Sequence, residues 1–324
     1  MTSPDTTRAA SPPGARADLP FSGPWLLAPM EGVTEPCFRD LVLEENRPER
    51  LGGAFTEFAR VVDRPLSRHT LRRHLGPRRH AAPVGLQLMG ADLGALAETA
   101  RRAVALGAPL VDLNFGCPAR GALRTCTGAA ALRDPAGLER TVRACAEAIP
   151  GVPLSAKIRA GYDDDTLLEE LARAAQEGGA ALLTVHCRTR AEHYSSQIDW
   201  GRVARAVASV EIPVCGNGGV RVHADLERMR RETGARYVMV GRAALGDPWI
   251  FEGRLVPAAE AARFLLRYAG ELRSRSAMSP RGVAGRLKQL LGHWTAGGLA
   301  VEGRATWLRE QDPERILARL RELL

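Results

Sequence analysis

Short apolar runs recur between Trp25 and Val240, and polar stretches with the spacing of amphipathic helices separate them. Each run is four or five residues long and rich in Val, Leu, Ile or aromatic residues, which is typical of buried strands. We expect eight strands, at Trp25–Pro29, Ala54–Glu57, Val84–Leu88, Leu110–Asn114, Leu154–Ile158, Leu182–His186, Pro213–Gly216 and Tyr237–Val240.

Apolar residues between these runs recur every three or four positions, which predicts helices with one buried face. We expect helices at Glu35–Glu45, roughly Arg64–Leu75, Asp92–Leu106, Pro135–Ile149, Thr166–Gln176, Trp200–Ser209 and Val222–Thr233.

This alternation indicates an α/β fold with a parallel sheet. Eight strand–helix units in about 230 residues fit a (β/α)8 TIM barrel, whereas a Rossmann sheet would carry GxGxxG after an early strand, and none is present. From about Leu255 only helical patterns remain, beginning with AAEAARFLLRYAGELRSR. We therefore expect a disordered N-terminal tail at 1–20, a barrel domain at 21–255 and an all-helical domain at 256–324.

The composition is that of an ordinary globular protein. Of 324 residues 45% are hydrophobic, and no apolar stretch approaches the roughly 20 residues that a membrane span needs. The first 20 residues lack the apolar core of a signal peptide, and the six cysteines show no CxxC spacing. We expect a cytoplasmic protein without membrane attachment, disulfide framework or metal site, and a monomer because no dimerisation stripe is evident.

The chain is basic, with a net charge of +8 and a pI near 9.7. This balance favours a polyanionic partner such as nucleic acid, although a solvated, arginine-rich surface accounts for it equally well. Only Lys157 and Lys288 among the 45 basic residues are lysines. A lysine kept where arginine is used almost everywhere suggests that a compact ammonium charge matters at Lys157.

Polar side chains stand at the ends of nearly all the expected strands. Barrel enzymes carry their chemistry at the carboxyl ends of the strands, so these groups are candidates for an active site rather than simple solvent-facing caps. They are Met30, Glu31, Glu57, Gln87, Asn114, Cys117, Lys157, Arg159, His186, Arg188, Asn217, Gly241 and Arg242.

Glycine-rich loops follow the seventh and eighth expected strands, as CGNGGVR at 215–221 and VGRAAL at 240–245. Barrels commonly bind phosphate in these two loops through backbone N–H groups, and Arg242 adds a charged donor. The pattern predicts a phosphorylated cofactor or substrate beside these strands.

Ordered motifs over about 220 residues resemble the tRNA-dihydrouridine synthase family. They are LLAPMEGVTEPCFR, FTEFARVVD, VGLQLMG, DLNFGCPAR, SAKIRAG, TVHCRTR, CGNGG and VMVGRAAL, and FTEFARVVD, SQIDW and RLKQLLGHW are most similar to the bacterial C-type branch. The resemblance implies an FMN enzyme that uses NADPH to reduce a uridine in the D-loop of tRNA to 5,6-dihydrouridine, at uridine 16 for the C-type branch.

The resemblance also implies a role for individual residues. Cys117 matches the proton donor of the family. The flavin would be bound by Pro29, Met30, Glu31, Gln87, Lys157, His186, Asn217, Gly218, Gly219, Gly241 and Arg242. The substrate would be contacted by Asn114, Arg159, Arg188 and Arg286.

The chemistry of these residue types agrees with the implied reaction. Reduction of the uracil C5–C6 bond needs a hydride from flavin N5 at C6 and a proton at C5 from the opposite face. A thiol is mostly protonated at neutral pH and can still release its proton to a developing enolate, which suits Cys117. A fixed cation such as Lys157 near the flavin N1–O2 edge favours the anionic reduced flavin. His186 is either a flavin contact or a hydrogen-bonded structural group.

Two further segments bear on tRNA. RPLSRHTLRRHLGPRRH at 64–80 supplies six arginines and three histidines, and Arg273, Arg275, Arg281 and Arg286 recur in the helical domain. These arginines predict phosphate contacts, although each run alone fits a solvated helix face.

The catalytic turn is followed by RTCTGAAAL where glycines are usual in the family, so Thr125, Cys126 and Thr127 should stiffen a loop that the resemblance implies moves.

Two other classes of function remain open. One is a small-molecule enzyme on the same barrel, either an FMN-dependent dehydrogenase of the dihydropyrimidine or dihydroorotate kind, or an aldolase with Lys157 as a Schiff base. The other is a tRNA-binding module without catalysis. The basic surface and the helical appendage favour the tRNA reductase over the first, and a colourless preparation with intact RNA affinity would support the second.

Overall fold

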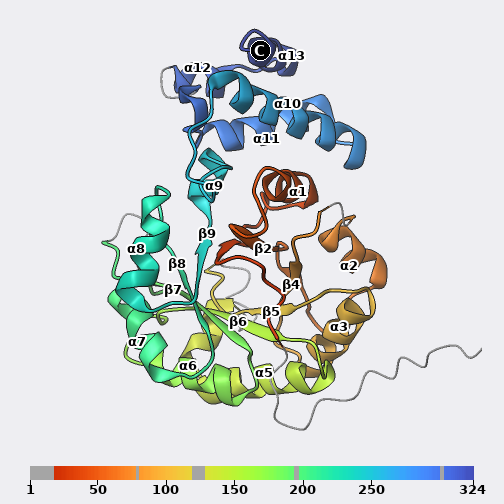
Figure 1. Cartoon of the computed structure of the whole chain (residues 1–324). Coiled ribbons are helices and arrows are strands. Elements are labelled where there is room, and N and C mark those ends of the chain that lie inside the picture. The colour runs from red at the N-terminus through yellow and green to blue at the C-terminus, as the bar shows by residue number, and fades with distance from the viewer. Residues whose placement is uncertain (1–17, 78–79, 119–127, 193–196, 300–302) are drawn as a thin grey trace, which may run out of the picture.

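The computed structural model describes residues 18–77, 80–118, 128–192, 197–299 and 303–324. A ring of strands lies inside a ring of helices, and further helices pack beyond one side of the barrel (Figure 1). The expected N-terminal tail lies outside the described residues except for 18–20, which form no helix or strand.

All strand pairings in the sheet are parallel, and pairings of β2 with both β1 and β4 close it into a barrel. The expected (β/α)8 fold is therefore confirmed. The strands are β1 (Trp25–Leu27), β2 (Leu51–Phe55), β3 (Ala59–Arg60), β4 (Val84–Met89), β5 (Val111–Asn114), β6 (Leu154–Arg159), β7 (Leu182–His186), β8 (Val214–Asn217) and β9 (Tyr237–Val240).

The second barrel strand is interrupted, and its last part is the short β3, which the sequence did not predict. At the interruption the hydroxyl of Thr56 accepts a hydrogen bond from the N–H of Gln87 (3.1 Å), in the place of a strand carbonyl. The same hydroxyl donates to the carbonyl of Glu57 (2.7 Å). Side-chain bonding of this kind ends a regular ladder and turns the chain at the carboxyl end of β2.

The barrel helices begin and end within a few residues of the predicted positions, and side-chain caps fix several of their first turns. Ser67, Asp92 and Asp134 accept the N–H of Thr70, Ala95 and Gly137, respectively. The helices are α1 (Pro36–Glu44), α2 (Arg68–Leu75), α3 (Leu93–Ala105), α5 (Pro135–Ala148), α6 (Leu168–Glu177), α7 (Gly201–Ser209) and α8 (Ala224–Thr233). The shorter η1 (Gly128–Arg133) and α9 (Arg242–Gly246) were missed, because so few residues show no helical period.

The interior of the barrel changes from apolar to polar along the strands. Successive side chains of a strand point to opposite faces, so Asp112 and Asn114 of β5 point inward, as does Leu110 just before it, and Val111 packs outward against the helices. An apolar plug fills the barrel interior at the amino ends of the strands. Within it, the ring centroid of Phe21 lies 5.9 Å from that of Phe55 and 5.6 Å from that of Tyr237. The amino-end plug comprises Phe21, Phe55, Leu110, Leu182 and Tyr237.

The C-terminal helices form a region of their own that packs on α1 (Figure 1). They are α10 (Ala258–Arg275), α11 (Pro280–Leu291), η2 (Ala296–Gly298), α12 (Arg304–Arg309) and α13 (Pro313–Arg321), and are called the helical C-terminal region below. Phe38 of α1 packs edge-on against Phe264 and Tyr268, and Arg275 binds the buried Asp40 (2.8 Å). No helix in the described part of the chain is long and apolar enough to cross a membrane.

Candidate functional site

A cavity of about 720 Å³ lies at the carboxyl ends of the strands, where the sequence predicts the site. Of the predicted residues, it is lined by Pro29, Met30, Glu31, Asn114, Cys117, Lys157, Arg159, His186, Arg188, Asn217, Gly218, Gly219, Gly241 and Arg242. Gln87 and Arg286 are not among its lining residues.

The turn that carries Cys117 is held on both sides of the preceding Gly116. The N–H of Gly116 donates to Oδ1 of Asn114 (2.9 Å), and its carbonyl accepts from Nε of Arg159 (2.7 Å). The carbonyl of Cys117 accepts from the N–H of Ala129 (3.0 Å). The partly exposed thiol therefore faces the cavity from a turn anchored to β5 and β6. Residues 125–127, whose effect on loop motion the sequence raised, lie outside the described residues.

Gln87 lies behind the cavity wall in a chain of buried hydrogen bonds. Its Nε2 donates to Oδ2 of Asp112 (2.6 Å), and its Oε1 accepts from Nδ2 of Asn114 (2.8 Å). Ser155 donates to the other oxygen of Asp112 (2.5 Å). A carboxylate accepts hydrogen bonds and donates none, so Asp112 requires Gln87 to turn its NH2 group toward it. Oε1 of Gln87 then faces the NH2 group of Asn114, and Oδ1 of Asn114 is directed at the N–H of Gly116.

Sequence reasoning missed Asp112 and Ser155 as parts of this site. Burial raises the pKa of the Asp112 carboxyl to about 6, against the lowering effects of the hydrogen bonds from Ser155 and Gln87 and of the Lys157 charge. The strand period contained a usable signal, because Asp112 stands two residues before Asn114 and so on the same face of β5.

Lys157 presents a buried amine to the cavity. Burial, and then the charge of Arg159, lower its pKa from 10.5 to about 8, while the nearby Asp112 opposes this shift. Among the residues that the structure describes, none forms a hydrogen bond or an ion pair with Nζ. A desolvated ammonium in this position is suited to an electron-rich group of a bound molecule.

His186 faces the cavity as a neutral ring. Burial, and then the charges of Lys157, Arg159 and Arg188, lower its pKa well below the usual value. Its Nδ1 accepts from the N–H of Arg188 (3.3 Å), so the neutral ring carries its proton on Nε2. A Cβ on Gly218 would lie 3.1 Å from Nε2, which explains a glycine there, at φ +100°.

The loops after β8 and β9 also line the cavity. Nδ2 of Asn217 donates to the carbonyl of Met239 (2.8 Å), which ties the two strand ends together. A Cβ on Gly241 would stand 3.5 Å from Sδ of Met30, so a side chain there would occupy the cavity. These close-set glycines and the unengaged amine of Lys157 fit a flavin mononucleotide, which needs space for a phosphate and a cation beside its ring.

The helical C-terminal region also reaches the cavity, which the sequence did not predict. Gln289, His293 and Thr295 line it, and the N–H of Thr295 binds the carbonyl of Gly246 at the end of α9 (2.9 Å). Partial burial, and then the charges of Arg242 and Arg304, lower the pKa of His293. No period in the sequence could have indicated these residues, because only the docking of the two regions brings them to the cavity.

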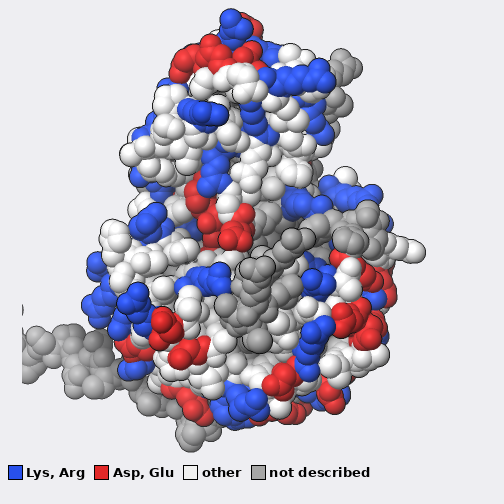
Figure 2. All heavy atoms as spheres, turned by 180° about the vertical axis from the view of Figure 1, so that it is seen from behind, with Lys and Arg blue, Asp and Glu red and all other residues white. Residues whose placement is uncertain are grey.

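Arg286 stands at the rim of the site among carboxylates. Its positive charge acts to lower the pKa of Glu35 and of Glu57, and a Cβ on Gly32 would lie 4.0 Å from its Nη1. Burial raises the pKa of Glu35 to about 6, although Tyr268 donates a hydrogen bond to it (2.6 Å). Figure 2 shows acidic side chains grouped between the barrel and the helical C-terminal region, with basic ones around them.

The arginines of the two predicted tRNA-contacting segments differ in what they bind. Arg64, Arg68, Arg72 and Arg73 are exposed around α2, and none of them forms an ion pair within the described part of the chain. Arg78 and Arg79 lie outside the described residues. In the helical C-terminal region Arg273 pairs with Glu314 (2.6 Å), and Arg275 pairs with Asp40 and Glu271 (2.8 and 3.1 Å). The α2 arginines, Arg64, Arg68, Arg72 and Arg73, are therefore more available for phosphate than Arg273 and Arg275.

Comparison with known proteins supports the resemblance seen in the motifs. Residues 26–277 match the family model described as dihydrouridine synthase (Dus). The chain is 36% identical over 285 residues to a tRNA-dihydrouridine(16) synthase of Pseudomonas putida, covering 82% of this chain and 86% of that protein. It is 37% identical over 275 residues to a tRNA-dihydrouridine synthase B of Xanthomonas axonopodis, covering 84% and 76%.

Two further matches extend over most of the chain. A tRNA-dihydrouridine(16) synthase of Aquipseudomonas alcaligenes is 36% identical over 318 residues, which is 90% of this chain and 96% of that protein. The solved structure of histamine dehydrogenase from Rhizobium sp. 4-9 is 12% identical, with a TM-score of 0.56, and covers 84% of this chain and 49% of that one. At this identity the structural likeness concerns the fold alone.

Proposed function

Because the chain belongs to the dihydrouridine synthase family of flavin-dependent oxidoreductases, we propose that it reduces uridine 16 of tRNA to 5,6-dihydrouridine, with FMN as cofactor and NADPH as reductant. Two of the relatives named above carry the position 16 in their names, and a third is of the B type, so the position is the finer part of the proposal.

The observation that carries the proposal is the convergence of three different groups on one cavity. A partly exposed thiol at Cys117, a buried ammonium at Lys157 and a neutral imidazole at His186 all line it. A cavity in which polar groups with shifted pKa values converge is a candidate active site on physical grounds.

FMN, when bound, would supply the chemistry for hydride transfer from NADPH to C6 of the uracil. Cys117 provides the proton that C5 requires, and the anchored Gly116 limits where its thiol can lie. The product gains one hydride and one proton, and NADPH leaves as NADP⁺.

The other site residues bind and orient. Lys157 would offer a positive charge to a bound flavin, and His186, protonated on Nε2, would donate a hydrogen bond to a molecule in the cavity. Pro29, Met30 and Glu31, which line the cavity, would contact the cofactor, and the loops with Asn217, Gly218, Gly219, Gly241 and Arg242 would hold its phosphate. Gln87, which is not among the lining residues, would act on the cofactor through its hydrogen bond to Asn114, and Asn114 would contact flavin and base.

The tRNA lies over the cavity mouth, and the target nucleotide leaves its stack to enter it. The α2 arginines, Arg159, Arg188 and Arg286 contact the RNA, and the helical C-terminal region, residues 256–324, serves as its second support. We propose further that the protein acts in the cytoplasm as a monomer.

The test combines purified protein, NADPH and a tRNA transcript that carries no modification. Mass spectrometry of nuclease fragments should find one dihydrouridine, at position 16, and the protein should be yellow from non-covalent FMN. A yellow protein that consumes NADPH but leaves every tRNA uridine intact would overturn the proposal and favour a dehydrogenase of free pyrimidines.

A further inference from the structure

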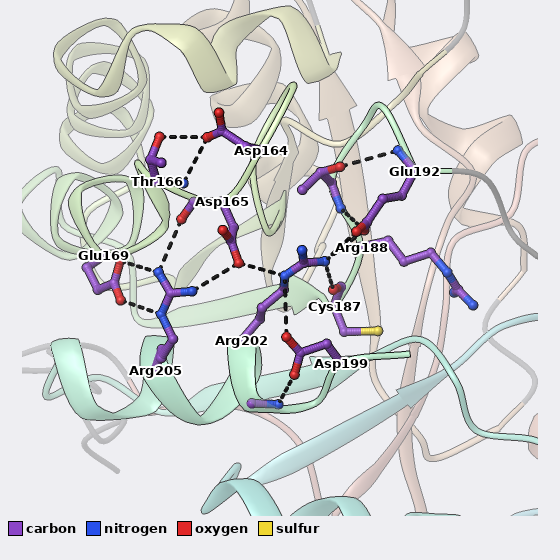
Figure 3. Close-up of polar contacts among 12 residues, drawn as sticks. Asp164, Asp165, Thr166, Glu169, Cys187, Arg188, Glu192, Asp199, Arg202 and Arg205 are labelled. Atoms are coloured by element: carbon purple, nitrogen blue, oxygen red, sulfur yellow. Dashed lines mark hydrogen bonds and ion pairs between the residues drawn. The ribbon is translucent and has the colours of Figure 1, made fainter. Parts of the chain in front are cut away.

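Arg202 of α7 binds both ends of segment 187–192, which follows β7. Its Nη1 donates to the carbonyl of Cys187 (3.2 Å) and to both carboxylate oxygens of Glu192 (2.7 and 3.0 Å). Its Nε donates to Asp165 (2.7 Å) and lies 3.7 Å from a carboxylate oxygen of Asp199, so the guanidinium lies among three carboxylates (Figure 3). The side chain is only 14% exposed, so solvent screens these ion pairs weakly.

Glu192 closes segment 187–192 into a turn. Its carboxylate accepts the N–H of Thr189 (2.9 Å), and its own N–H donates to the Thr189 hydroxyl (3.3 Å). Burial alone would raise the pKa of Glu192, but its bonds to Arg202 and Thr189 hold that pKa below the ordinary value. The acceptor for Thr189 is therefore a carboxylate at neutral pH.

The carbonyl of Thr189 leads from this turn to the catalytic one. It accepts from Nη1 of Arg159 (3.1 Å), and Nε of the same guanidinium binds the carbonyl of Gly116 (2.7 Å), next to Cys117. Arg159 is buried, and its planar fork fixes the two carbonyls relative to one another. A continuous path of hydrogen bonds thus runs from Arg202 through Glu192, Thr189 and Arg159 to the residue before the thiol.

The chain offers a matched control three residues further along α7. Arg205 binds Glu169 through Nε (2.7 Å) and Asp165 through Nη1 (3.0 Å), so it shares one carboxylate with Arg202 (Figure 3). Within the described part of the chain it makes no hydrogen bond to segment 187–192. A substitution of Arg205 removes comparable ion pairs without touching the path to Cys117.

We propose that Arg202 is a positioning residue for Cys117, which acts through segment 187–192 and Arg159 to hold the catalytic turn. The inference rests on the proposed function in that it takes Cys117 as the proton donor. Loss of the guanidinium frees Cys187 and Glu192, lets the Thr189 carbonyl move from Arg159, and so loosens the hold on Gly116.

The test compares Arg202→Met with Arg205→Met in FMN-loaded protein, well below the unfolding temperature. The rate of Cys117 alkylation by iodoacetamide, followed by peptide mass spectrometry, reports the thiol without reference to activity. We expect at least a threefold change in that rate for Arg202→Met and less than twofold for Arg205→Met. The rate constant for tRNA reduction by the pre-reduced protein should fall about tenfold in Arg202→Met alone, because small misplacements of reacting groups are costly.

Three further readouts separate positioning from general damage. FMN content and tRNA affinity should stay within twofold of the parent in both variants, and Arg202→Lys, which keeps one ion pair, should recover part of the lost rate. Equal alkylation rates in Arg202→Met and Arg205→Met overturn the inference. If the parent itself leaves tRNA unreduced, the proposed function fails, and alkylation still decides whether Arg202 positions Cys117.

Discussion

The two ends of the barrel interior are built from the same strands but perform different tasks. At the amino ends, Leu110, Leu182 and Tyr237 fill the space with apolar side chains. Four residues beyond Leu110 and Leu182, the inward positions hold Asn114 and His186 and border the cavity. Substitutions at the first end should therefore change stability and leave the chemistry intact, and those at the second end should do the reverse.

The largest effect is expected from Cys117→Ala at the cavity end. Loss of a positioned general acid typically lowers the rate by on the order of 10²–10⁴. Dihydrouridine formation at saturating tRNA should fall by that factor, while the midpoint of urea unfolding stays within measurement error because the thiol is partly exposed. A large loss of stability in this variant would break the comparison.

Leu110→Ala at the other end should show the opposite pattern. Leu110 is fully buried in the amino-end plug, and removal of such a side chain costs about 2–5 kcal/mol of unfolding free energy. The turnover per folded molecule should match the parent at a temperature where both proteins are folded. A fall in turnover without a fall in stability would show that the plug takes part in the chemistry.

Lys157→Met sharpens the comparison, because here stability and function should move in opposite directions. The lowered pKa of Lys157, about 8 instead of 10.5, means that folding disfavours its charged form. The cost is fully present below pH 8 and disappears as the pH rises toward 10.5. With flavin removed from both proteins, the variant should be more stable at pH 7 by about 1–3 kcal/mol, since one pKa unit corresponds to about 1.4 kcal/mol.

Urea unfolding at pH 7 and at pH 10 checks this sign. The advantage of Lys157→Met should shrink at the higher pH, and the variant should bind FMN more weakly than the parent at pH 7. An advantage that is the same at both pH values would contradict the lowered pKa of Lys157.

The smallest effect concerns the outer surface. Arg68→Gln with Arg72→Gln on α2 should reduce the slope of log tRNA affinity against log salt by about 0.7–0.9 for each lost phosphate contact. The matched control is Arg140→Gln with Arg143→Gln on α5, whose arginines already pair with Asp134 and Glu139. Equal slopes in the two variants would place the RNA contacts elsewhere.

The same comparison explains how much the sequence could predict. The carboxyl ends of the strands could be predicted, because a polar residue such as Asn114, Lys157 or His186 at or near the end of an apolar run marks where the barrel interior turns polar. The closed barrel confirmed the predicted order of strands and helices. The supports of these residues were not readable. Asp112 acts through Gln87, Arg202 acts through Glu192, and both bonds join residues that no local period relates.

The cavity wall contributed by the helical C-terminal region was unpredictable for a related reason. His293 reaches the cavity because α9 packs on the backbone beside it: a Cβ on Gly246 would stand 2.2 Å from the His293 carbonyl. Contacts of this kind depend on how two regions dock, and the sequence of either region alone does not contain that information.

The most direct test of the account is the oxidation of the NADPH-reduced protein by tRNA, followed in a single turnover through the flavin absorbance. The account predicts that parent and Cys117→Ala are reduced by NADPH at the same rate and bind tRNA equally well, but that tRNA reoxidises the variant 10²–10⁴ times more slowly. Reoxidation of Cys117→Ala by tRNA at the rate of the parent would contradict the assignment of the proton donor.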